Sequence, residues 1–272
     1  MTTIATPTTV QPGTRRDRAS IWTVVEYQFF VARAFLPVIL MVGIVTPLLY
    51  VLSLGVGLGS IVDDHGNTLG VKYIVFVAPA FLTAAALQIA ANEASFPLFG
   101  GFKWNRTFHG MIATPLTTRQ VCDGELAWIA IRLFGNSSIY LAIMASFGAV
   151  NRPLVLLCVP IATLTGLAFA ASVAAVAATI ENEGSTFNVL FRFVVTPMFL
   201  FSGTFYPISQ LPTWGQWLAH ISPLWHGTEL ARATAIGRLS GASIAGHLAF
   251  LVVWLGVAVA LARWRFRVKL EK

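Results

Sequence analysis

The chain has 272 residues, of which 56% are hydrophobic and only 11% are charged, and its mean hydropathy is +0.74. Soluble domains carry about 25% charged residues, so this composition excludes a soluble protein and predicts one multi-span, all-α membrane domain. The net charge of +7 does not indicate nucleic-acid binding, because the basic residues form no base-reading motif. Cys122 lies at a span boundary and Cys158 inside a span, so neither a disulfide nor a zinc site is expected.

The N-terminal region is predicted to have two parts. Residues 1–18 are rich in Thr and Pro and lack the short apolar core of a signal peptide, so we expect a disordered cytoplasmic tail. Residues 19–34 place Trp22, Val25 and Phe29 on one apolar stripe, which predicts an amphipathic helix lying flat in the cytoplasmic interface. The alternative is that these residues form the lower part of the first span.

Six apolar stretches predict membrane spans, and they are residues 36–59, 71–94, 124–150, 154–180, 187–202 and 244–262. Thr117 and Gln120 form a capping-box pattern that predicts the start of the third helix. Six spans put both termini on one side of the membrane. Placing that side in the cytoplasm gives it twelve Lys and Arg residues against four outside, which decides the orientation.

One ionisable residue, Arg132, falls inside the third span, where an unpaired charge costs about 2.5 to 3.5 kcal/mol on insertion scales. Glu93 and Glu125 lie near the same cytoplasmic end and are its candidate partners, and Glu125 is seven residues away on the same helical face. Such a pair holds the fold together or transmits motion, and the sequence leaves both roles open.

The sequence lacks the motifs of the common energy-converting and hydrolytic sites. No G-x-x-x-x-G-K-[ST] and no H-E-x-x-H occurs, so we expect no ATP site, no catalytic residues and no metal site in this chain. Carboxylates within the spans, which an ion-coupled carrier needs, are nearly missing. A stand-alone ion-gradient carrier or facilitator is therefore the second hypothesis, and a membrane-embedded enzyme is the third.

A proline- and tryptophan-rich stretch, residues 198–232, reads MFLFSGTFYPISQLPTWGQWLAHISPLWHGTELAR. Its pattern F-x-S-G-x-F-Y-P-I-x-x-L-P-x-W, followed by S-P-L-x-H and E-L-x-R, resembles the signature of ABC-2-type permeases. The similarity is greatest to the branch with the nodulation lipooligosaccharide and daunorubicin exporters. Residues 106–116, R-x-x-x-G-x-x-x-T-P-L, are similar to the family's cytoplasmic-loop pattern.

The resemblance implies that residues 19–272 form one ABC-2-type transmembrane domain of an exporter. A separate ATPase subunit, in two copies and carrying ATP and Mg, would dock under the cytoplasmic loop 96–123 and the interfacial helix 19–34. A second permease copy, or a similar permease, would complete a transporter for an amphipathic substrate in the bacterial cytoplasmic membrane. This chain would hold no cofactor of its own.

The resemblance also assigns roles to particular residues. The residues expected to couple to the ATPase are Glu26, Lys103, Trp104, Arg106, His109 and Arg119, and the alternative is that these cations only meet anionic lipid. The expected substrate path runs along Phe76, Phe81, Phe191, Val195 and Phe199.

An external re-entrant segment, residues 203–242, is expected to act as a lid with two short helices, at about 212–220 and 225–235. The lid residues named from the sequence are Phe205, Pro207, Pro212, Trp214, His226 and Glu229. His226 and Glu229 lie one helical turn apart, which favours a polar pair over a metal contact.

Overall fold

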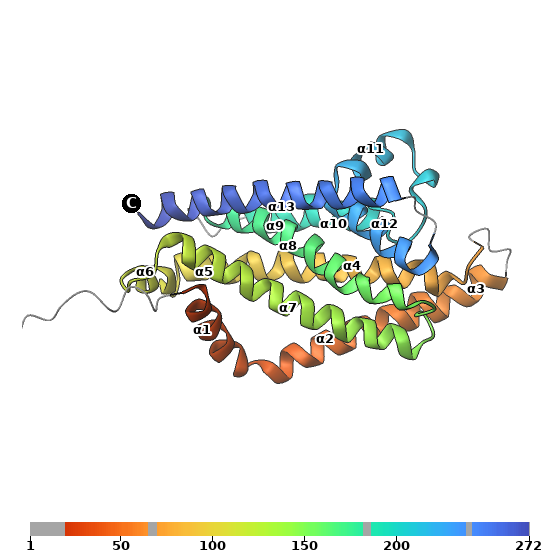
Figure 1. The fold of residues 1–272 in the computed structure, drawn as a ribbon, viewed down its shortest axis with the longest axis horizontal. Helices are drawn as coiled ribbons and strands as arrows, with labels where there is room; N and C mark the ends of the chain where they lie inside the picture. The colour runs from red at the N-terminus through yellow and green to blue at the C-terminus, as the bar shows by residue number, and fades with distance from the viewer. Residues whose placement is uncertain (1–19, 65–69, 182–185, 238–240, 272) are drawn as a thin grey trace, which may run out of the picture.

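The structure is a computed structural model that describes residues 20–64, 70–181, 186–237 and 241–271. In these residues every regular element is helical, and Figure 1 shows long helices running side by side in a bundle. Five helical segments are long and apolar enough to cross a membrane, and they are Leu36–Asp64, Tyr73–Phe102, Thr118–Ser146, Pro153–Ala177 and Gly241–Leu270. The predicted class, an all-helical multi-span membrane protein, is confirmed.

The two ends of the bundle carry different short elements (Figure 1). Helix α1 (Ile21–Arg33), helix α6 (Thr107–Ile112) and the last turn of α13 (Gly241–Leu270) lie together at one end, which we call the α6 end. Helix α3 (Gly59–Asp64) and helix α11 (Thr213–Ile221) lie at the other, the α11 end. The predicted topology assigns the α6 end to the cytoplasm.

The first apolar segment combines α2 (Leu36–Tyr50), a π-helix η2 (Val51–Leu58) and α3. It continues past residue 59, where the prediction ended the span, because the GVGLGS run is wound as helix throughout. Gly55 serves packing: a Cβ built on it would lie 2.9 Å from Cγ1 of Ile74. The glycine lets η2 approach the next helix closely.

The central helix of the bundle is α4 (Tyr73–Ala94), whose ends match the predicted second span. Of the apolar part of this segment, 78% is buried inside the bundle. The corresponding share is 11% for α13 and 22% for the first segment, so α13 and α2 are the peripheral helices. Helix α4 packs mainly against α8 (Cys158–Ala177), where small residues such as Gly166 allow close approach to the backbone of Ala86.

The predicted cytoplasmic loop contains two short helices, α5 (Phe96–Phe102) and α6, joined by a turn at residues 103–106. Helix α7 (Thr118–Ser146) follows and begins with the predicted capping box. The amide of Gln120 donates to Oγ1 of Thr117 at 3.2 Å, and the amide of Thr117 donates to Oε1 of Gln120 at 2.9 Å. The capping box explains why α7 begins six residues before the predicted residue 124.

The predicted fourth span, 154–180, comprises a 3-10 turn η3 (Pro153–Leu157) followed by α8. The predicted fifth span, 187–202, corresponds to a shorter apolar run, Thr186–Phe201, rather than to a full-length spanning helix. About 20 residues are needed to cross a bilayer. The run comprises three helices, which are α9 (Thr186–Leu190), the π-helix η4 (Phe191–Val195) and α10 (Thr196–Phe201).

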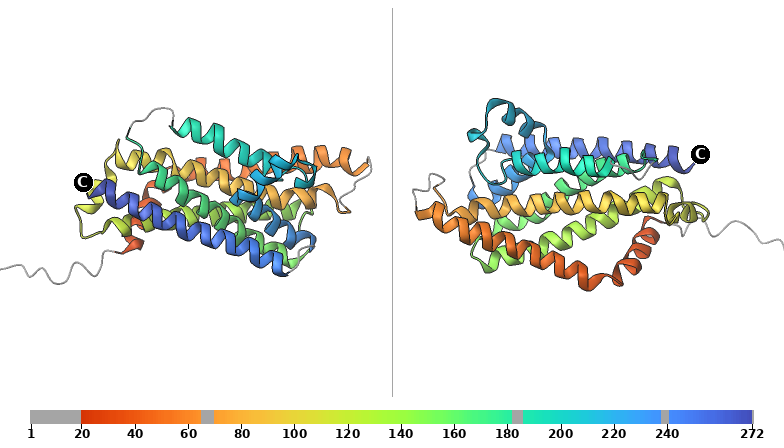
Figure 2. Two further views of the ribbon diagram at one scale, coloured as in Figure 1. Left: turned by 90° about the horizontal axis from the view of Figure 1, so that it is seen from above. Right: turned by 180° about the vertical axis from the view of Figure 1, so that it is seen from behind.

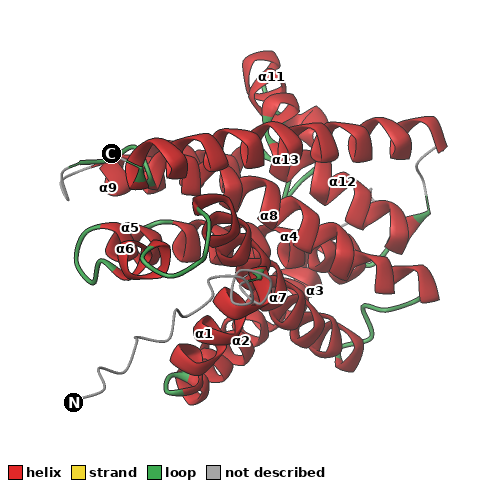
Figure 3. Cartoon of the chain, turned by 60° about the vertical axis from the view of Figure 1, so that its left-hand side comes forward, coloured by secondary structure: helices red, strands yellow, loops and turns green. Residues whose placement is uncertain are grey.

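Two short helices follow at the α11 end, close to the bounds expected for the lid. After a 3-10 turn η5 (Ile208–Gln210), α11 stands away from the bundle, as Figure 3 shows. Helix α12 (Pro223–Ile236) instead packs against α4, α8 and α13. Helix α13 extends eight residues past the predicted end at 262, because Phe266 and Leu270 are buried in the core.

Candidate functional site

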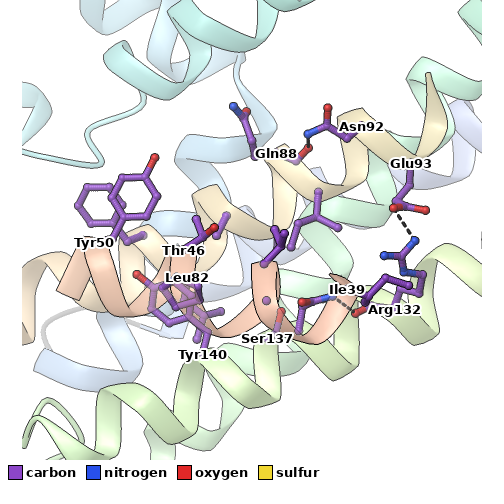
Figure 4. Close-up of a pocket in the computed structure, with 18 of the residues that line it drawn as sticks. Ile39, Thr46, Tyr50, Leu82, Gln88, Asn92, Glu93, Arg132, Ser137 and Tyr140 are labelled. Carbon is purple, nitrogen blue, oxygen red and sulfur yellow. Dashed lines mark hydrogen bonds and ion pairs between the residues drawn. The ribbon is translucent and has the colours of Figure 1, made fainter. Parts of the chain in front are cut away.

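A cavity of about 470 Å³ lies between α2, α4 and α7 and is closed on one side by Phe199 of α10 (Figure 4). It has the size of a typical site for one drug-sized molecule. Its aliphatic walls come from Val38, Ile39, Val42, Pro47, Leu82, Ala85, Ala86 and Ile89. Its polar groups come from Thr46, Tyr50, Gln88, Asn92, Glu93, Arg132, Asn136, Ser137 and Tyr140.

A glycine on α2 sets the width of this cavity. A Cβ built on Gly43 would lie 2.5 Å from Oδ1 of Asn136, so α2 meets α7 at this point with no space for a side chain. Asn136 is itself held by a hydrogen bond from its Nδ2 to the carbonyl oxygen of Arg132, at 3.0 Å. A side chain at position 43 would therefore require the Asn136 amide to leave its hydrogen bond to Arg132.

One end of the cavity carries an ion pair. Nη1 of Arg132 lies 2.5 Å from Oε1 of Glu93, and about a fifth of each side chain is exposed. Glu93 is thus the partner of Arg132 that the structure shows. Glu125, the other candidate, is 3% exposed and instead accepts a hydrogen bond from Nε2 of Gln28 at 2.6 Å.

The other end of the cavity is aromatic. Tyr50 stacks on Phe81 with ring centroids 5.0 Å apart, and Phe81 meets Phe199 edge-on at 6.1 Å. Tyr140 is 2% exposed, and its hydroxyl has no hydrogen-bond partner within the described ranges. Leaving a buried hydroxyl unpaired costs about 1 to 3 kcal/mol, so this oxygen is a strong position for a bound polar group.

The two ends define the shape of a suitable ligand. Arg132 and Tyr140 are eight residues apart on α7, which places them about 12 Å apart along the helix. Figure 4 shows Glu93 and Arg132 at one end and Tyr50 and Tyr140 at the other, with aliphatic side chains between. An elongated molecule with an apolar body and a polar or hydroxylated head fits this arrangement.

The predicted path residues do not all meet at this cavity. Phe81 and Phe199 line it. Phe76 instead lies under the guanidinium of Arg232, 3.9 Å from Cζ to the ring centroid. Val195 is 1% exposed and packed in the core, and Phe191 packs at the edge of that core.

The polar lining residues were not predicted as a path, although they carry a readable signal. Gln88 and Asn92 are four residues apart on α4, and Arg132, Asn136 and Tyr140 recur every four residues on α7. Such a polar stripe on one face of an otherwise apolar helix indicates a lined cavity rather than lipid contact. Their convergence on one cavity required the tertiary structure.

The residues expected to couple to the ATPase are exposed. Arg106 has a left-handed backbone (φ 50°) at the turn before α6, and Trp104 and His109 are exposed beside it. Lys103 donates from Nζ to the carbonyl oxygen of Glu181 at 2.8 Å. Glu26 on α1 is also exposed.

The aromatic side chain of Phe108 anchors helix α6 to the bundle. Phe108 packs between Phe102 and Phe266, with ring centroids 4.8 and 5.8 Å away. A Cβ on Gly101 would lie 2.6 Å from the ring of Phe108, so the glycine leaves room for this ring. The exposed turn before α6 is therefore held firmly against α5 and α13.

Three consecutive residues connect the start of α7 to its neighbours. Asp123 accepts two hydrogen bonds from Arg263 of α13, at 2.6 and 2.9 Å, and also lies 3.7 Å from Nε of Arg119, whose side chain is 70% exposed. Gly124 receives Val24 of α1 at the crossing of the two helices. Glu125 accepts a hydrogen bond from Gln28, so α1 is joined to α7 at two consecutive residues.

A buried arginine organises the other end of the bundle. Arg232 is 5% exposed and donates from Nε to the carbonyl oxygen of Phe76 at 3.2 Å and from Nη2 to that of Thr204 at 3.0 Å. It also donates to the carbonyl oxygen of Gly203 and pairs with Glu229 at 3.2 Å. The E-L-x-R pattern thus ties α12 to α4 and to the break after α10.

The lid residues have other partners than the sequence suggested. Nδ1 of His226 lies 2.8 Å from Nδ1 of His247, whereas Glu229 pairs with Arg232. Burial lowers the pKa of His226 to about 4; the neighbouring His247 and His220 also lower it, against a hydrogen bond to the backbone of His220. Across the described ranges no three His, Cys, Asp or Glu side chains are placed to hold a metal ion.

The remaining lid residues shape the backbone and the aromatic cluster. Phe205 packs on Phe81 at 5.1 Å. Pro207 precedes η5 and Pro212 precedes α11. Trp214 is exposed and meets Phe201 edge-on at 5.7 Å.

The described helices form a multi-span bundle with an amphipathic cavity, an architecture that is typical of membrane transport proteins. Residues 19–236 match the family described as ABC-2 type transporter, and the chain belongs to this family. It is therefore a multi-pass membrane permease of an ABC exporter, the subunit that does not hydrolyse ATP.

Similar curated proteins agree with this assignment. The chain is 32% identical to Nodulation protein J of Sinorhizobium fredii (strain NBRC 101917 / NGR234) over 76% of its own length and 78% of the relative's. It is 31% identical to Nodulation protein J of Rhizobium leguminosarum bv. viciae, over 78% and 80%. The protein of that name from Neorhizobium galegae is 29% identical over 90% and 93%. Among solved structures, none matches the chain significantly.

Proposed function

We propose that this permease exports an amphipathic compound, such as a drug, a glycolipid or a lipid-linked saccharide, out of the cytoplasm or the inner leaflet. A separate cytoplasmic ATPase, in two copies, supplies the energy from ATP and Mg. The permease works with a second copy or with a similar permease in the bacterial cytoplasmic membrane. It crosses the membrane six times and keeps both termini in the cytoplasm.

The observation that carries this proposal is the cavity between α2, α4 and α7. Its ion pair is self-neutralising, so the site favours a neutral or zwitterionic head over a strongly charged one. A hydroxylated head exchanges hydrogen bonds with Asn92, Glu93 and Arg132, while the apolar body lies along Ile39, Leu82 and their neighbours. The unpartnered hydroxyl of Tyr140 takes a second polar group of the ligand.

The ATPase docks at the α6 end in this proposal. Trp104 and Arg106 lie in the turn before α6 and His109 lies on α6, next to the buried Phe108, so the docked subunit pushes on an anchored element. Through Gly124 and Glu125, α1 and α7 then move together. Since α7 carries Arg132, this movement reaches the polar end of the cavity.

A co-purification experiment tests the docking step. The full chain is expressed in its host with an affinity tag, and the ATPase subunit that co-purifies is quantified for wild type and for Arg106→Glu. The matched control is Lys72→Glu, which reverses an equally exposed cation at the opposite end of the bundle. We expect Arg106→Glu to reduce ATPase recovery and Lys72→Glu to preserve it. Recovery of no ATPase with wild type, or equal recovery with both variants, contradicts the proposal.

The second candidate function is a stand-alone ion-gradient carrier. The one observation in its favour is Glu93, a carboxylate that faces a cavity inside the bundle. Proteoliposomes containing only this chain discriminate the two: a carrier takes up substrate along an imposed proton or sodium gradient, whereas a permease subunit is silent until the ATPase and ATP are added.

A further inference from the structure

A second cavity, of about 390 Å³, is lined by residues of α8, η4, α10 and α11 and by Trp254 of α13. Seen from above in Figure 2, α8 lies between α10 and α13. The cavity has three sides: α8 forms the floor, η4 and α10 form one wall, and Trp254 of α13 stands opposite. We call this cavity the α8 groove.

The α8 groove is elongated along the bundle. Its floor is made of Phe169, Ser172, Val173 and Val176, which is one stripe of α8 about 10 Å long. Its wall is made of Leu190, Phe193, Val194, Pro197, Met198 and Phe201, a stripe about 16 Å long. These lengths are about a third and about half of the roughly 30 Å hydrocarbon core of a bilayer.

The polar atoms at the edges of the α8 groove are already paired. Nε1 of Trp254 donates to Oγ of Ser172 at 3.1 Å, and Oγ of Ser172 lies 3.1 Å from the carbonyl oxygen of Ala168, to which it donates. The hydroxyls of Ser202 and Ser222 lie 2.8 Å apart, at the end next to α11. The groove therefore offers no free polar side chain to a headgroup, and its occupant must be hydrocarbon.

The helix above the groove presents an apolar face outward. Trp214, Trp217, Leu218 and Ile221 recur at helical spacing on α11, and each is more than half exposed. Leu218 and Ile221 also line the end of the groove. Tryptophan is enriched at the level of lipid headgroups, so α11 lies at the membrane interface with this face toward the acyl chains.

We propose that the α8 groove binds one acyl chain of a bilayer phospholipid from the leaflet at the α11 end, which the charge bias makes the outer leaflet. The chain enters beneath α11, with its headgroup beside Trp214 and Trp217, and runs down the floor formed by α8. It fills space between α10 and α8 that side chains leave open. Phe187 and Phe199 hold α9 and α10 against the bundle on their inner side, and the lipid supports the outer side of this segment.

The lipid is favoured over other occupants by where the groove opens. Its rim residues Phe193 and Val194 are 69% and 40% exposed, and across the opening α13 exposes Val253 and Val257 at 64% and 66%. These side chains belong to the apolar belt that faces lipid in a membrane-embedded helix. The amphipathic substrate, by contrast, finds its polar partners in the first cavity.

A photo-crosslinking map tests the proposal on the full chain without the ATPase, so its outcome is independent of the export function. The purified chain is reconstituted in nanodiscs of phosphatidylcholine in which one acyl chain carries a diazirine. After irradiation, labelled peptides are mapped by mass spectrometry. We expect labelling at Val176, Val194 and Leu218 to exceed that at Val253 and Val257 several-fold. Equal or stronger labelling of the α13 face overturns the proposal.

A pair of variants sharpens the result. Val176→Phe puts a ring into the floor of the groove, and Val257→Phe adds the same ring on the open face of α13. We expect Val176→Phe to abolish the excess labelling of the groove and Val257→Phe to preserve it. If Val176→Phe does not fold, the wild-type map alone decides.

Discussion

The ion pair between Glu93 and Arg132 allows a sharp test of how the cavity is held open. Replacing one partner by a neutral residue, as in Glu93→Gln or Arg132→Gln, leaves the other charge in an apolar surrounding without compensation. We expect both single variants to be destabilised. Replacing both partners, as in Glu93→Leu with Arg132→Met, removes both charges together and restores most of the loss.

The size of the effect follows from burial. Breaking a fully buried pair costs about 3 to 5 kcal/mol. Here about a fifth of each side chain is exposed and the cavity opens at its side, so we expect about 2 to 3 kcal/mol for each single variant. The double variant should fall within about 1 kcal/mol of wild type, because two apolar side chains of similar volume replace the pair.

The measurement is thermal unfolding of the purified chain in one detergent, followed by loss of the monodisperse peak. The predicted loss corresponds to a shift in apparent Tm of roughly 5 to 10 °C for each single variant. Arg119→Gln is the matched control, because the Arg119 side chain is 70% exposed and Asp123, 3.7 Å away, keeps its two hydrogen bonds from Arg263. That variant should cost less than about 0.5 kcal/mol.

A double-mutant cycle built from Glu93→Gln, Arg132→Gln and the variant that carries both changes decides between this reasoning and its alternative. If the pair holds α4 and α7 together, the two single effects are non-additive by at least about 1 kcal/mol. Additive effects, or single variants that match Arg119→Gln, would refute the claim that the pair is buried and coupled in the membrane. Because the double variant is expected to be nearly as stable as wild type, its substrate-stimulated ATPase activity then shows whether the two charges are needed for transport.

Three further predictions follow from single contacts. Tyr140→Phe should stabilise the chain slightly, by up to about 1 kcal/mol, because it removes an unpartnered buried hydroxyl, yet it should weaken substrate-stimulated ATPase activity. Gly43→Ala should lower apparent Tm and reduce the same activity, because its Cβ would lie 2.5 Å from Oδ1 of Asn136 and push α2 from α7. Stability should fall as the pH drops from about 6.5 toward about 4, because the unfolded chain protonates His226 in this range while the folded chain keeps it neutral. In thermal melts at a series of pH values, His226→Gln should make apparent Tm depend less steeply on pH.

Each of these predictions has a control or a contradicting outcome. Tyr73→Phe removes a hydroxyl that donates to the carbonyl oxygen of Phe205 at 3.1 Å, so it should destabilise, opposite in sign to Tyr140→Phe. Gly256→Ala adds a Cβ with no atom within 4 Å and should be neutral, and equal losses at both glycines would contradict the packing argument. If apparent Tm depends on pH in the same way in His226→Gln as in wild type, other groups cause the loss of stability at low pH.

The local features of this chain were predictable because their causes lie within a few residues. The uninterrupted apolar runs predict membrane helices, and the capping box at Thr117 and Gln120 predicts where α7 begins. The amphipathic stripe predicted α1, and the proline and tryptophan pattern predicted short helices after residue 203. Helix ends were not predictable in the same way: the segment after Tyr50 continues as a π-helix, and its Gly55 packs against Ile74 of α4.

Partner choice was decided only by the tertiary structure. Glu125 is on the same helix as Arg132, and the sequence spacing suggested it as a partner. In the structure Arg132 instead forms an ion pair with Glu93, and Glu125 accepts a hydrogen bond from Gln28. His226 and Glu229 share a helical face, yet each pairs with another residue. A side chain selects among all neighbours in space, and spacing along one helix reports on only one of them.

The sequence by itself determined the class of this protein, its helices and its family resemblance, since hydropathy, caps and short motifs are read from adjacent residues. The tertiary structure decided which polar residues line a cavity, which are buried and join helices by hydrogen bonds, as Arg232 does, and which apolar faces stay exposed. The physical reason is that each apolar helix is compatible with many rotations about its own axis. Only the close contacts between helices, at positions such as Gly43, Gly124 and Gly166, select one of them.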